Sequence, residues 1–391
     1  MKKLVGLALA AVVGLTAAAS GAQAAEPIRM PFIQTFSGPY IDFGERMWRE
    51  GVIPSLEVIN NEQGGINGRP LEFYKVDNYF PDTARFLSDF RRLCMDPTIP
   101  IAYGIGATKT TIAVFEDVKR CEIPAFNPSS GGAWPHRNAD GTKDFGGWMF
   151  RYQPQAEETF PGMFKFVQER MGMKTASISH THDDDFAVNN RRIALKAFAD
   201  AGVEIVADVS IKTKETNFSS QVAAVRRANP DAHLILHQPG DGGTMVLQLK
   251  DRGVKAQMLG DNVVGGEDLW ILSKGTAAGM IGYSTYAVDD PRPIVQDWLE
   301  KWRAATGKKE SAPDAFVTAY YEGTLILAEV LRGVTDLNDR DQIRDGFTKI
   351  KDRESITGTI SWPTAGDLVR SEPILVQRDE NGLMKKWPPA N

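Results

Sequence analysis

Hydrophobic residues recur at two different spacings in this chain, and the two spacings alternate along it. Between residues 43 and 62 the apolar positions follow the rhythm of a helix, at Met47, Val52, Leu56 and Ile59. From Leu71 to Val76 the side chains instead alternate between two faces, as in a β-strand. Gly64-Gly65 and Asn67-Gly68 lie between the two patterns, and glycine reaches the left-handed conformation that ends a helix. This segment therefore predicts a helix, a tight reversal and a strand.

The alternation of strand and helix runs through most of the chain. The first round predicts strands at 28–36, 71–76, 99–104 and 123–126, and helices at 43–62, 81–93 and 110–119. After a loop at 131–147, a second round predicts helices at 159–171, 185–201, 217–228 and 242–252, and strands at 175–179, 203–209, 233–237 and 257–259. Repeated β-α units form parallel sheets with helices on both faces. The predicted fold class is therefore α/β, with two doubly wound lobes.

Beyond residue 279 the pattern changes. A strand at 280–286 leads into helices at 291–305 and 313–332, and the end of the chain suggests a β-hairpin of 358–362 and 373–378.

The first residues have the pattern of a secretory signal peptide. Lys2 and Lys3 precede an apolar run at 4–19, and Ala22-Gln23-Ala24 is a small-residue cleavage site. We expect residues 1–25 to be removed and the protein to work in the periplasm; a membrane span is the alternative. Loss of the two lysines changes the formal charge from −5 to −7, which does not favour nucleic acid or an anionic membrane as partner.

The cysteine content leaves one question open. Cys94 and Cys121 each lie near the end of a predicted helix, with one strand between the helices. The two helices are expected on the same face of the sheet, so a disulfide is one possibility in an oxidising compartment and two buried thiols are the other.

Ligands of open α/β sheets bind beyond the carboxyl ends of the strands, next to helix N-termini. In the first lobe this rule selects the loops 35–40, 104–111 and 127–132, and in the second lobe 180–186, 237–243 and 261–266. Thr108 and Ser129 offer hydroxyls beside glycines in two of these loops, and such groups can hold a carboxylate. The alternative is that these hydroxyls only cap helices.

Several motifs occur in an order that resembles one family. They are Phe36-Ser-Gly-Pro-Tyr40, Gly64-Gly-Ile-Asn-Gly-Arg69, the run that begins at Gly104, Ile123-Pro-Ala-Phe-Asn-Pro-Ser129, Phe150-Arg-Tyr-Gln-Pro154 and the helix around Tyr320. The chain resembles the periplasmic substrate-binding proteins of the leucine/isoleucine/valine type over nearly all its mature length. The resemblance implies a monomer with two lobes, joined by three crossing strands, that closes on a small ligand. It also implies delivery to the permease of an ABC importer, with no cofactor and no catalysis.

The resemblance also assigns residues to parts of the molecule. Lobe I is expected to comprise 26–152 and 287–355, and lobe II 153–286 and 356–391. Thr108 falls where the family places a hydroxyl on the ligand carboxylate, and Ser129 and Gly131 share that role. The side-chain pocket corresponds to Phe43, Ala107 and Phe316. In lobe II, Phe186 takes the place of a tyrosine that stacks over the ligand, with His237 or Gln238 opposite it.

Two departures from the family bear on the ligand. The acidic position after the first crossing strand appears here as Ala156, and a second falls on Asp261 or Asn262, depending on the alignment. If Asn262 faces the ligand, an ammonium would lose its anionic partner, which is costly in a buried site. An amine-free acid, such as an aromatic carboxylate, is then the alternative to an amino acid, and Phe43, Phe186 and Phe316 suit a flat apolar ring.

Other functions have weaker support. His180-Thr-His182-Asp-Asp-Asp185 contains metal-ligand types, but it reads better as a strand end followed by a helix cap, so we expect no metal. The chain offers no Gly-x-Ser-x-Gly elbow around Ser37 or Ser129, which argues against a serine hydrolase. A sensory domain would use the same fold ahead of a membrane segment.

Overall fold

The computed structural model describes residues 25–371 and 374–388. The expected signal peptide, residues 1–25, lies outside the described residues apart from Ala25. In the described part of the chain, none of the helices has the length and hydropathy that a membrane span requires.

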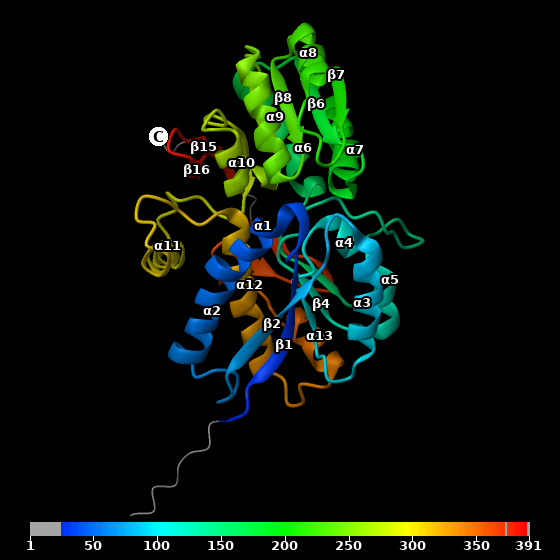
Figure 1. Ribbon diagram of the computed structural model, residues 1–391, viewed down its shortest axis with the longest axis vertical. Helices are drawn as coiled ribbons and strands as arrows, with labels where there is room; N and C mark the ends of the chain where they lie inside the picture. The colour runs from blue at the N-terminus through cyan, green and yellow to red at the C-terminus, as the bar shows by residue number, and fades with distance from the viewer. Residues whose placement is uncertain (1–24, 372–373, 389–391) are drawn as a thin grey trace, which may run out of the picture.

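Two β-sheets form the centres of two lobes, which are stacked along the long axis of the molecule (Figure 1). Within the described residues, the lobe I sheet has six parallel strands in the order β13-β5-β4-β3-β1-β2. They are β1 Ile28–Gln34, β2 Leu71–Asp77, β3 Ala102–Tyr103, β4 Ala125–Asn127, β5 Met149–Arg151 and β13 Gly366–Asp367.

The lobe II sheet has seven strands within the same residues, in the order β16-β15-β10-β9-β8-β6-β7. They are β6 Thr175–Thr181, β7 Glu204–Ile211, β8 Ala232–Leu236, β9 Gln257–Gly260, β10 Ile281–Ser284, β15 Ile374–Arg378 and β16 Met384–Lys386. The first five are parallel, whereas β15 and β16 are antiparallel additions at one edge. The doubly wound α/β class predicted from the sequence is confirmed.

Helices cover both faces of each sheet. In lobe I they are α1 Ile41–Arg46, α2 Ile53–Glu57, α3 Thr83–Met95, α4 Thr108–Ala113, α5 Phe115–Cys121, α11 Pro293–Thr306, α12 Ala315–Arg332 and α13 Arg340–Thr348. In lobe II they are α6 Ala156–Met171, α7 Asp185–Asp200, α8 Ser219–Ala228, α9 Pro239–Asp251 and α10 Glu267–Leu272. α1 and α2 belong to one continuous helical segment, in which Met47–Val52 and Val58–Glu62 form wider, π-type turns.

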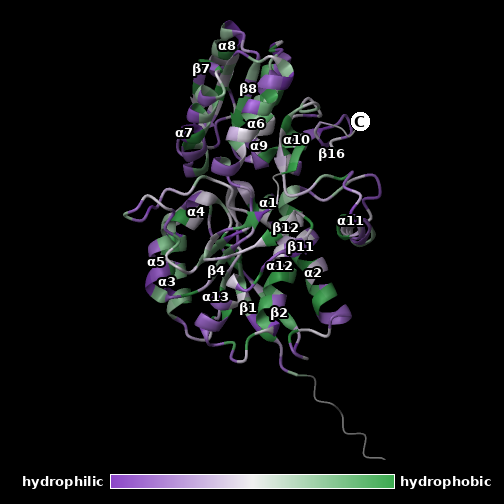
Figure 2. Cartoon of the chain, turned by 180° about the vertical axis from the view of Figure 1, so that it is seen from behind, coloured by the Kyte–Doolittle hydropathy of each residue, from purple (hydrophilic) through white to green (hydrophobic). Residues whose placement is uncertain are grey.

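Neighbouring residues of β1 show how the sheet is covered on two sides. Phe32 packs in the large core with residues of α12, while Ile33 packs with Phe86 of α3 and Val118 of α5. In Figure 1, α2 and α12 accordingly lie on one side of β1 and β2, and α3 and α5 on the other. α12 is mostly buried and is coloured hydrophobic along much of its length in Figure 2.

The strand order places the carboxyl ends of the strands at the boundary between the lobes. It reverses between β1 and β3 in lobe I and between β6 and β8 in lobe II, and such a reversal opens a crevice for ligands. The chain crosses between lobes after β5, after β10 and between β14 (Val369–Arg370) and β15, which makes the three-strand hinge.

The C-terminal part differs from the expected hairpin. The strand at Gly358–Ser361 (β12) pairs with β11 (Arg353–Ser355) and β14 (Val369–Arg370) in a small three-stranded sheet, whereas β15 pairs with β10 and β16. The prediction of a hairpin between these two strands is therefore wrong. The range 356–391 is also divided, because β13 joins the lobe I sheet beside β5 and only β15 and β16 join lobe II. The sequence pattern also missed α13.

Cys94 and Cys121 form a disulfide, with their Cα atoms 5.8 Å apart. Cys94 lies near the end of α3 and Cys121 ends α5, so the bridge joins two helices on one face of the lobe I sheet. Of the two possibilities left open by the sequence, the structure contains the disulfide.

Candidate functional site

A cleft of about 820 Å³ lies between the two lobes, at the carboxyl ends of their strands. Most of the residues expected to bind ligand line it: Phe43, Ala107, Thr108, Ser129, Gly131, Phe186, Gln238, Asn262 and Phe316. The other two, His237 and Asp261, are buried within lobe II and do not line the cleft. Topology alone therefore brings together residues from loops that are more than 200 positions apart in the chain.

The lobe I wall of the cleft is built from hydroxyls and backbone amides. Thr108 Oγ1, at the start of α4, accepts a hydrogen bond from the Gly132 N–H at 3.0 Å and lies 3.2 Å from Ser130 Oγ. Ser129 Oγ donates to the Gly106 carbonyl at 2.9 Å and also lies 2.9 Å from the Tyr320 hydroxyl. These hydroxyls face the cleft and at the same time hold the loops in place. These groups are polar and uncharged, whereas charged residues of lobe I, among them Arg46, Glu50 and Lys308, line other parts of the cleft.

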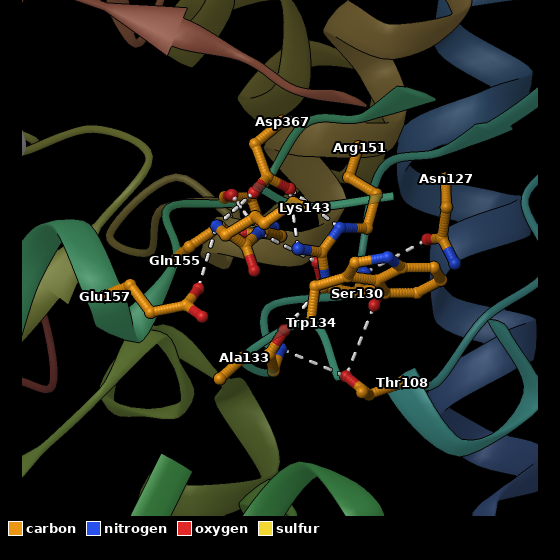
Figure 3. Close-up of polar contacts among 12 residues, drawn as sticks. Thr108, Asn127, Ser130, Ala133, Trp134, Lys143, Arg151, Gln155, Glu157 and Asp367 are labelled. Carbon is orange, nitrogen blue, oxygen red and sulfur yellow. Dashed lines mark hydrogen bonds and ion pairs between the residues drawn. The ribbon is translucent and has the colours of Figure 1, made fainter. Parts of the chain in front are cut away.

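A buried arginine braces this wall from behind (Figure 3). Arg151 is fully buried at the end of β5, and its Nη1 donates to the carbonyl of Gly132 at 2.7 Å. Its guanidinium pairs with Asp367 (Nη2–Oδ1 2.6 Å) and lies over the ring of Trp134, 4.9 Å from the centroid. Lys143 also contacts Asp367, at 2.6 Å. The loop that carries Ser129 and Gly131 is thereby fixed to the hinge strand and to β13.

Phenylalanine rings form the apolar part of the cleft. Phe43 and Phe316 of lobe I meet edge to face with their centroids 5.3 Å apart. Phe80 of lobe I and Phe186 of lobe II also line the cleft. This arrangement favours a ligand with an apolar side chain or ring.

Two buried carboxylates behind the lobe II wall, Asp184 and Asp261, are engaged by lobe II itself. Asp184 caps α7 by accepting from the Phe186 N–H at 3.1 Å, and it accepts from Gln238 Nε2 at 2.7 Å. Burial raises the pKa of Asp184 to about 6. Asp261 accepts from the Val263 N–H at 3.0 Å and from Asn190 Nδ2 at 2.9 Å, and burial raises its pKa to about 7. Neither carboxylate is directed at the cleft as a free anion.

Asn262 is the member of the Asp261-Asn262 pair that lines the cleft. Its side chain is buried, and its Nδ2 lies 3.5 Å from Gln153 Oε1. A Cβ at Gly131 would lie 2.4 Å from Asn262 Nδ2, so only glycine fits where this amide of lobe II covers the loop of lobe I. Of Asp261 and Asn262, between which the sequence left the choice open, Asn262 lines the cleft, and the group that it presents there is a neutral amide.

Of His237 and Gln238, the two alternatives that the sequence left open, Gln238 lines the cleft and His237 does not. His237 Nδ1 lies 2.8 Å from Thr181 Oγ1 and its Nε2 lies 2.9 Å from Ser179 Oγ, so the ring faces into lobe II. The same Ser179 hydroxyl lies 3.0 Å from Nε2 of His233, which is four residues earlier and therefore on the same side of β8. Desolvation lowers the pKa of both rings, that of His233 to about 3. Gln238, the next residue, points the other way and lines the cleft.

The two lobes contact each other across the cleft. The Tyr40 hydroxyl of lobe I donates to Asp241 Oδ2 at 3.1 Å, and Arg46 Nη1 pairs with Asp268 at 2.7 Å. Deeper inside, the Ala133 N–H of lobe I donates to Asn190 Oδ1 of α7 at 2.8 Å. Arg46 is buried, so its pair with lobe II is shielded from solvent.

Sequence reasoning missed several residues of this site, among them Gln34, Tyr40, Arg46 and Asp241. Tyr40 and Asp241 belong to loops that the sheet rule had selected, so the rule could have found them. Arg46 lies within a helix, and its partner Asp268 is 222 positions away, so no local pattern marks it.

Comparisons with known proteins agree with this geometry. A sequence model described as periplasmic binding protein matches residues 27–377. A Leu/Ile/Val-binding protein homolog from Brucella melitensis is 24% identical, over 94% of each chain. The leucine-, isoleucine-, valine-, threonine- and alanine-binding protein of Pseudomonas aeruginosa is 21% identical, over 92% of each chain.

Two solved structures illustrate the likeness in fold. One is the substrate-binding protein of a branched-chain amino acid transporter from Streptococcus pneumoniae in complex with isoleucine, with a TM-score of 0.78 and 19% identity, over 93% of this chain and 100% of that one. The other is a solute-binding protein of an ABC transporter from R. palustris in complex with benzoate, with a TM-score of 0.78 and 16% identity, over 92% and 95%.

Proposed function

Because the chain belongs to the periplasmic binding protein family, we propose that it captures a small carboxylate-bearing solute between its lobes and delivers it to an ABC importer. The observation that carries this proposal is the neutral, hydroxyl-rich wall of Thr108, Ser129 and Gly131, enclosed by lobe II and flanked by phenylalanines. Hydrogen bonds from hydroxyl and backbone groups to a carboxylate are charge-assisted, so such a wall binds an anion without a cation.

An amino acid is the first candidate ligand, since relatives over the whole chain are named for leucine, isoleucine and valine. An amine-free carboxylic acid with an apolar ring is the second. It is favoured by the amide of Asn262 in the cleft and by the phenylalanine rings, and a protein of the same fold has been crystallised with benzoate.

Hinge closure is the mechanism that we propose for capture. As in other periplasmic binding proteins, a ligand that touches both lobes stabilises the closed form by its differential affinity. The contacts of Tyr40 with Asp241 and of Arg46 with Asp268 join the lobes at the cleft and would form as it closes. The protein would act as a periplasmic monomer, meet the importer's permease in this form, and leave the ligand chemically unchanged.

A ligand panel tests the proposal. Purified mature protein (residues 26–391) is screened by thermal shift against free amino acids and against aromatic and aliphatic acids, with titration calorimetry of each hit. A tight ligand raises the melting temperature by mass action. We expect at least one carboxylate to bind with a micromolar or lower Kd, and chromatography to recover it unchanged. Binding of no carboxylate, or conversion of the bound solute, would contradict the proposal.

A further inference from the structure

Asn262 offers a buried hydrogen-bonding group to the ligand. Its side chain is only 2% exposed and lines the cleft, and within residues 25–371 and 374–388 its Oδ1 has no hydrogen-bond donor. A buried amide oxygen left without a donor costs about 1–3 kcal/mol. The position therefore favours a ligand that supplies a hydrogen-bond donor at this point.

The neighbouring carboxylate cannot turn towards the cleft without loss of other contacts. Asp261 accepts from Asn190 Nδ2, while Asn190 Oδ1 accepts from the Ala133 N–H of lobe I. Asp261 also caps the turn that begins at Asn262, through the Val263 N–H. Reorientation of Asp261 would thus undo a cap and a contact between the lobes.

The other acids of the cleft wall are held by partners or lie towards solvent. Asp241 accepts from Tyr40, Asp268 pairs with Arg46, and Glu215 accepts from the Lys212 N–H. Asp184, which does not line the cleft, accepts from Gln238. Glu50 and Glu267 contact Lys308, and Asp42 is exposed. An ammonium buried at Asn262 would meet a neutral amide, and burial of a charge without an anion is costly. A hydroxyl donates a hydrogen bond there at a lower desolvation cost.

Gly131 relates this ligand donor to the ligand carboxylate. This glycine lies in the loop to which the proposed function assigns the ligand carboxylate, and the Asn262 amide covers it directly. A group that reaches Asn262 is therefore attached next to the carboxylate carbon.

We propose that the cleft selects a 2-hydroxy carboxylate with an apolar side chain, and that Asn262 determines this preference over the corresponding 2-amino acid. The inference rests on the proposed function, because it assumes that the carboxylate binds at Thr108 and Ser129. The hydroxyl donates to Asn262 Oδ1, and the side chain lies against Phe43, Phe186 and Phe316.

Two matched ligand series test it by calorimetry at pH 7.5. One comprises 4-methylpentanoate, 2-hydroxy-4-methylpentanoate and leucine; the other comprises 3-phenylpropanoate, 2-hydroxy-3-phenylpropanoate and phenylalanine. In at least one series we expect the hydroxy acid to bind about tenfold tighter than the unsubstituted acid, as for one good hydrogen bond, and tighter than the amino acid by a larger factor.

Variants of Asn262 make the test specific. Asn262→Ala should abolish the difference in affinity between the hydroxy acid and the unsubstituted acid. Asn262→Asp should reverse the order, so that the amino acid binds tighter than the hydroxy acid. Asn338→Asp is the control for the added charge, since Asn338 is exposed and outside the cleft, and it should keep the wild-type order. Thermal unfolding of each variant confirms that it is folded.

The outcomes separate the two proposals. If wild type binds the amino acid tightest, or binds the hydroxy and unsubstituted acids equally, the inference is wrong and the proposed function stands. If Asn262→Ala keeps the preference, Asn262 does not determine it. If none of the acids in the series or in the wider panel binds, the proposed function itself is wrong.

Discussion

The two lobes build their halves of the cleft by different physical means. The lobe I wall consists of hydroxyls and backbone amides, braced by the buried Arg151 and by a disulfide within its helical layer. The lobe II wall rests on buried titratable groups that do not line the cleft themselves, namely Asp184, Asp261, His233 and His237. The uncharged groups of Thr108, Ser129 and Gly131 in lobe I thus face a lobe II wall whose supporting hydrogen bonds depend on protonation.

This difference predicts that the two lobes respond to different changes. Loss of a brace or of the disulfide should act through lobe I and should depend little on pH. Changes of pH between about 5 and 7 should act through lobe II, because desolvation shifts the pKa values of its aspartates upward and of its histidines downward.

Arg151→Met should have the largest effect on stability. It leaves the Gly132 carbonyl without its hydrogen-bond donor and removes a positive charge that pairs with Asp367. Removal of one partner of a buried ion pair typically costs about 3–5 kcal/mol. Urea unfolding measures this loss in the free energy of unfolding. The control Arg91→Met removes a largely exposed guanidinium from Asp117, which keeps its pair with Arg120, and should cost less than about 1 kcal/mol. Equal losses in both variants would show that Arg151 is not a brace.

Removal of the disulfide should come next. Cys94 and Cys121 are 27 positions apart, and closure of a loop of this length stabilises a fold by about 3 kcal/mol through the entropy of the unfolded chain. The double variant Cys94→Ala/Cys121→Ala and the reduced wild type should lose similar amounts. Hydrogen exchange should show the loss in lobe I and leave the protection of β6 and β8 unchanged. A loss of protection spread evenly over both lobes would contradict the proposed difference between lobe I and lobe II.

Thr108→Ala should weaken ligand binding more than it weakens the fold. A hydrogen bond to a charged group contributes about 1.5–3 kcal/mol, so affinity for the tightest carboxylate of the panel should fall by roughly 10- to 100-fold. Stability should fall by about 1 kcal/mol, because the Gly132 N–H loses its acceptor. Thr108→Ser keeps the hydroxyl and should retain most of the affinity. Unchanged affinity in Thr108→Ala would remove Thr108 from the site.

The sequence predicted the lobe I wall better than the lobe II wall, and the reason is physical. Strand order and the position of loops follow from periodicity, so Thr108, Ser129 and Gly131 were found together and the family resemblance is confirmed. In lobe II the question was which of two adjacent side chains faces the cleft. Asp261 turns inward because Asn190, 71 positions away, donates to it, and no local pattern contains that contact.

The C-terminal hairpin was mispredicted because short strands that the pattern missed take its place. β12 pairs with its neighbours in sequence, β11 and β14, whereas β15 pairs with β10, far earlier in the chain, and with β16. Edge strands as short as β13 carry too little pattern to be recognised.

His233→Gln tests the pH sensitivity of lobe II and should give the smallest effect. The folded state keeps His233 neutral, since desolvation lowers its pKa to about 3, whereas the unfolded chain takes up a proton below its usual pKa near 6.5. The contribution of His233 is therefore fully present above pH 6.5 and is lost as the pH falls. The loss reaches about 2 kcal/mol at pH 5.

The cost of His233→Gln, measured by urea unfolding, should accordingly be about 2 kcal/mol smaller at pH 5 than at pH 7.5. Asp184 and Asp261 act in the opposite direction, because their raised pKa values favour the folded state at low pH, but they are present in both proteins and cancel in the difference. His182→Gln, which removes an exposed ring of lobe II, is the control with which the pH dependence of the His233→Gln cost is compared. A cost of His233→Gln that does not change with pH would mean that this ring is not held neutral, and the contrast between the two lobes would then rest on the aspartates alone.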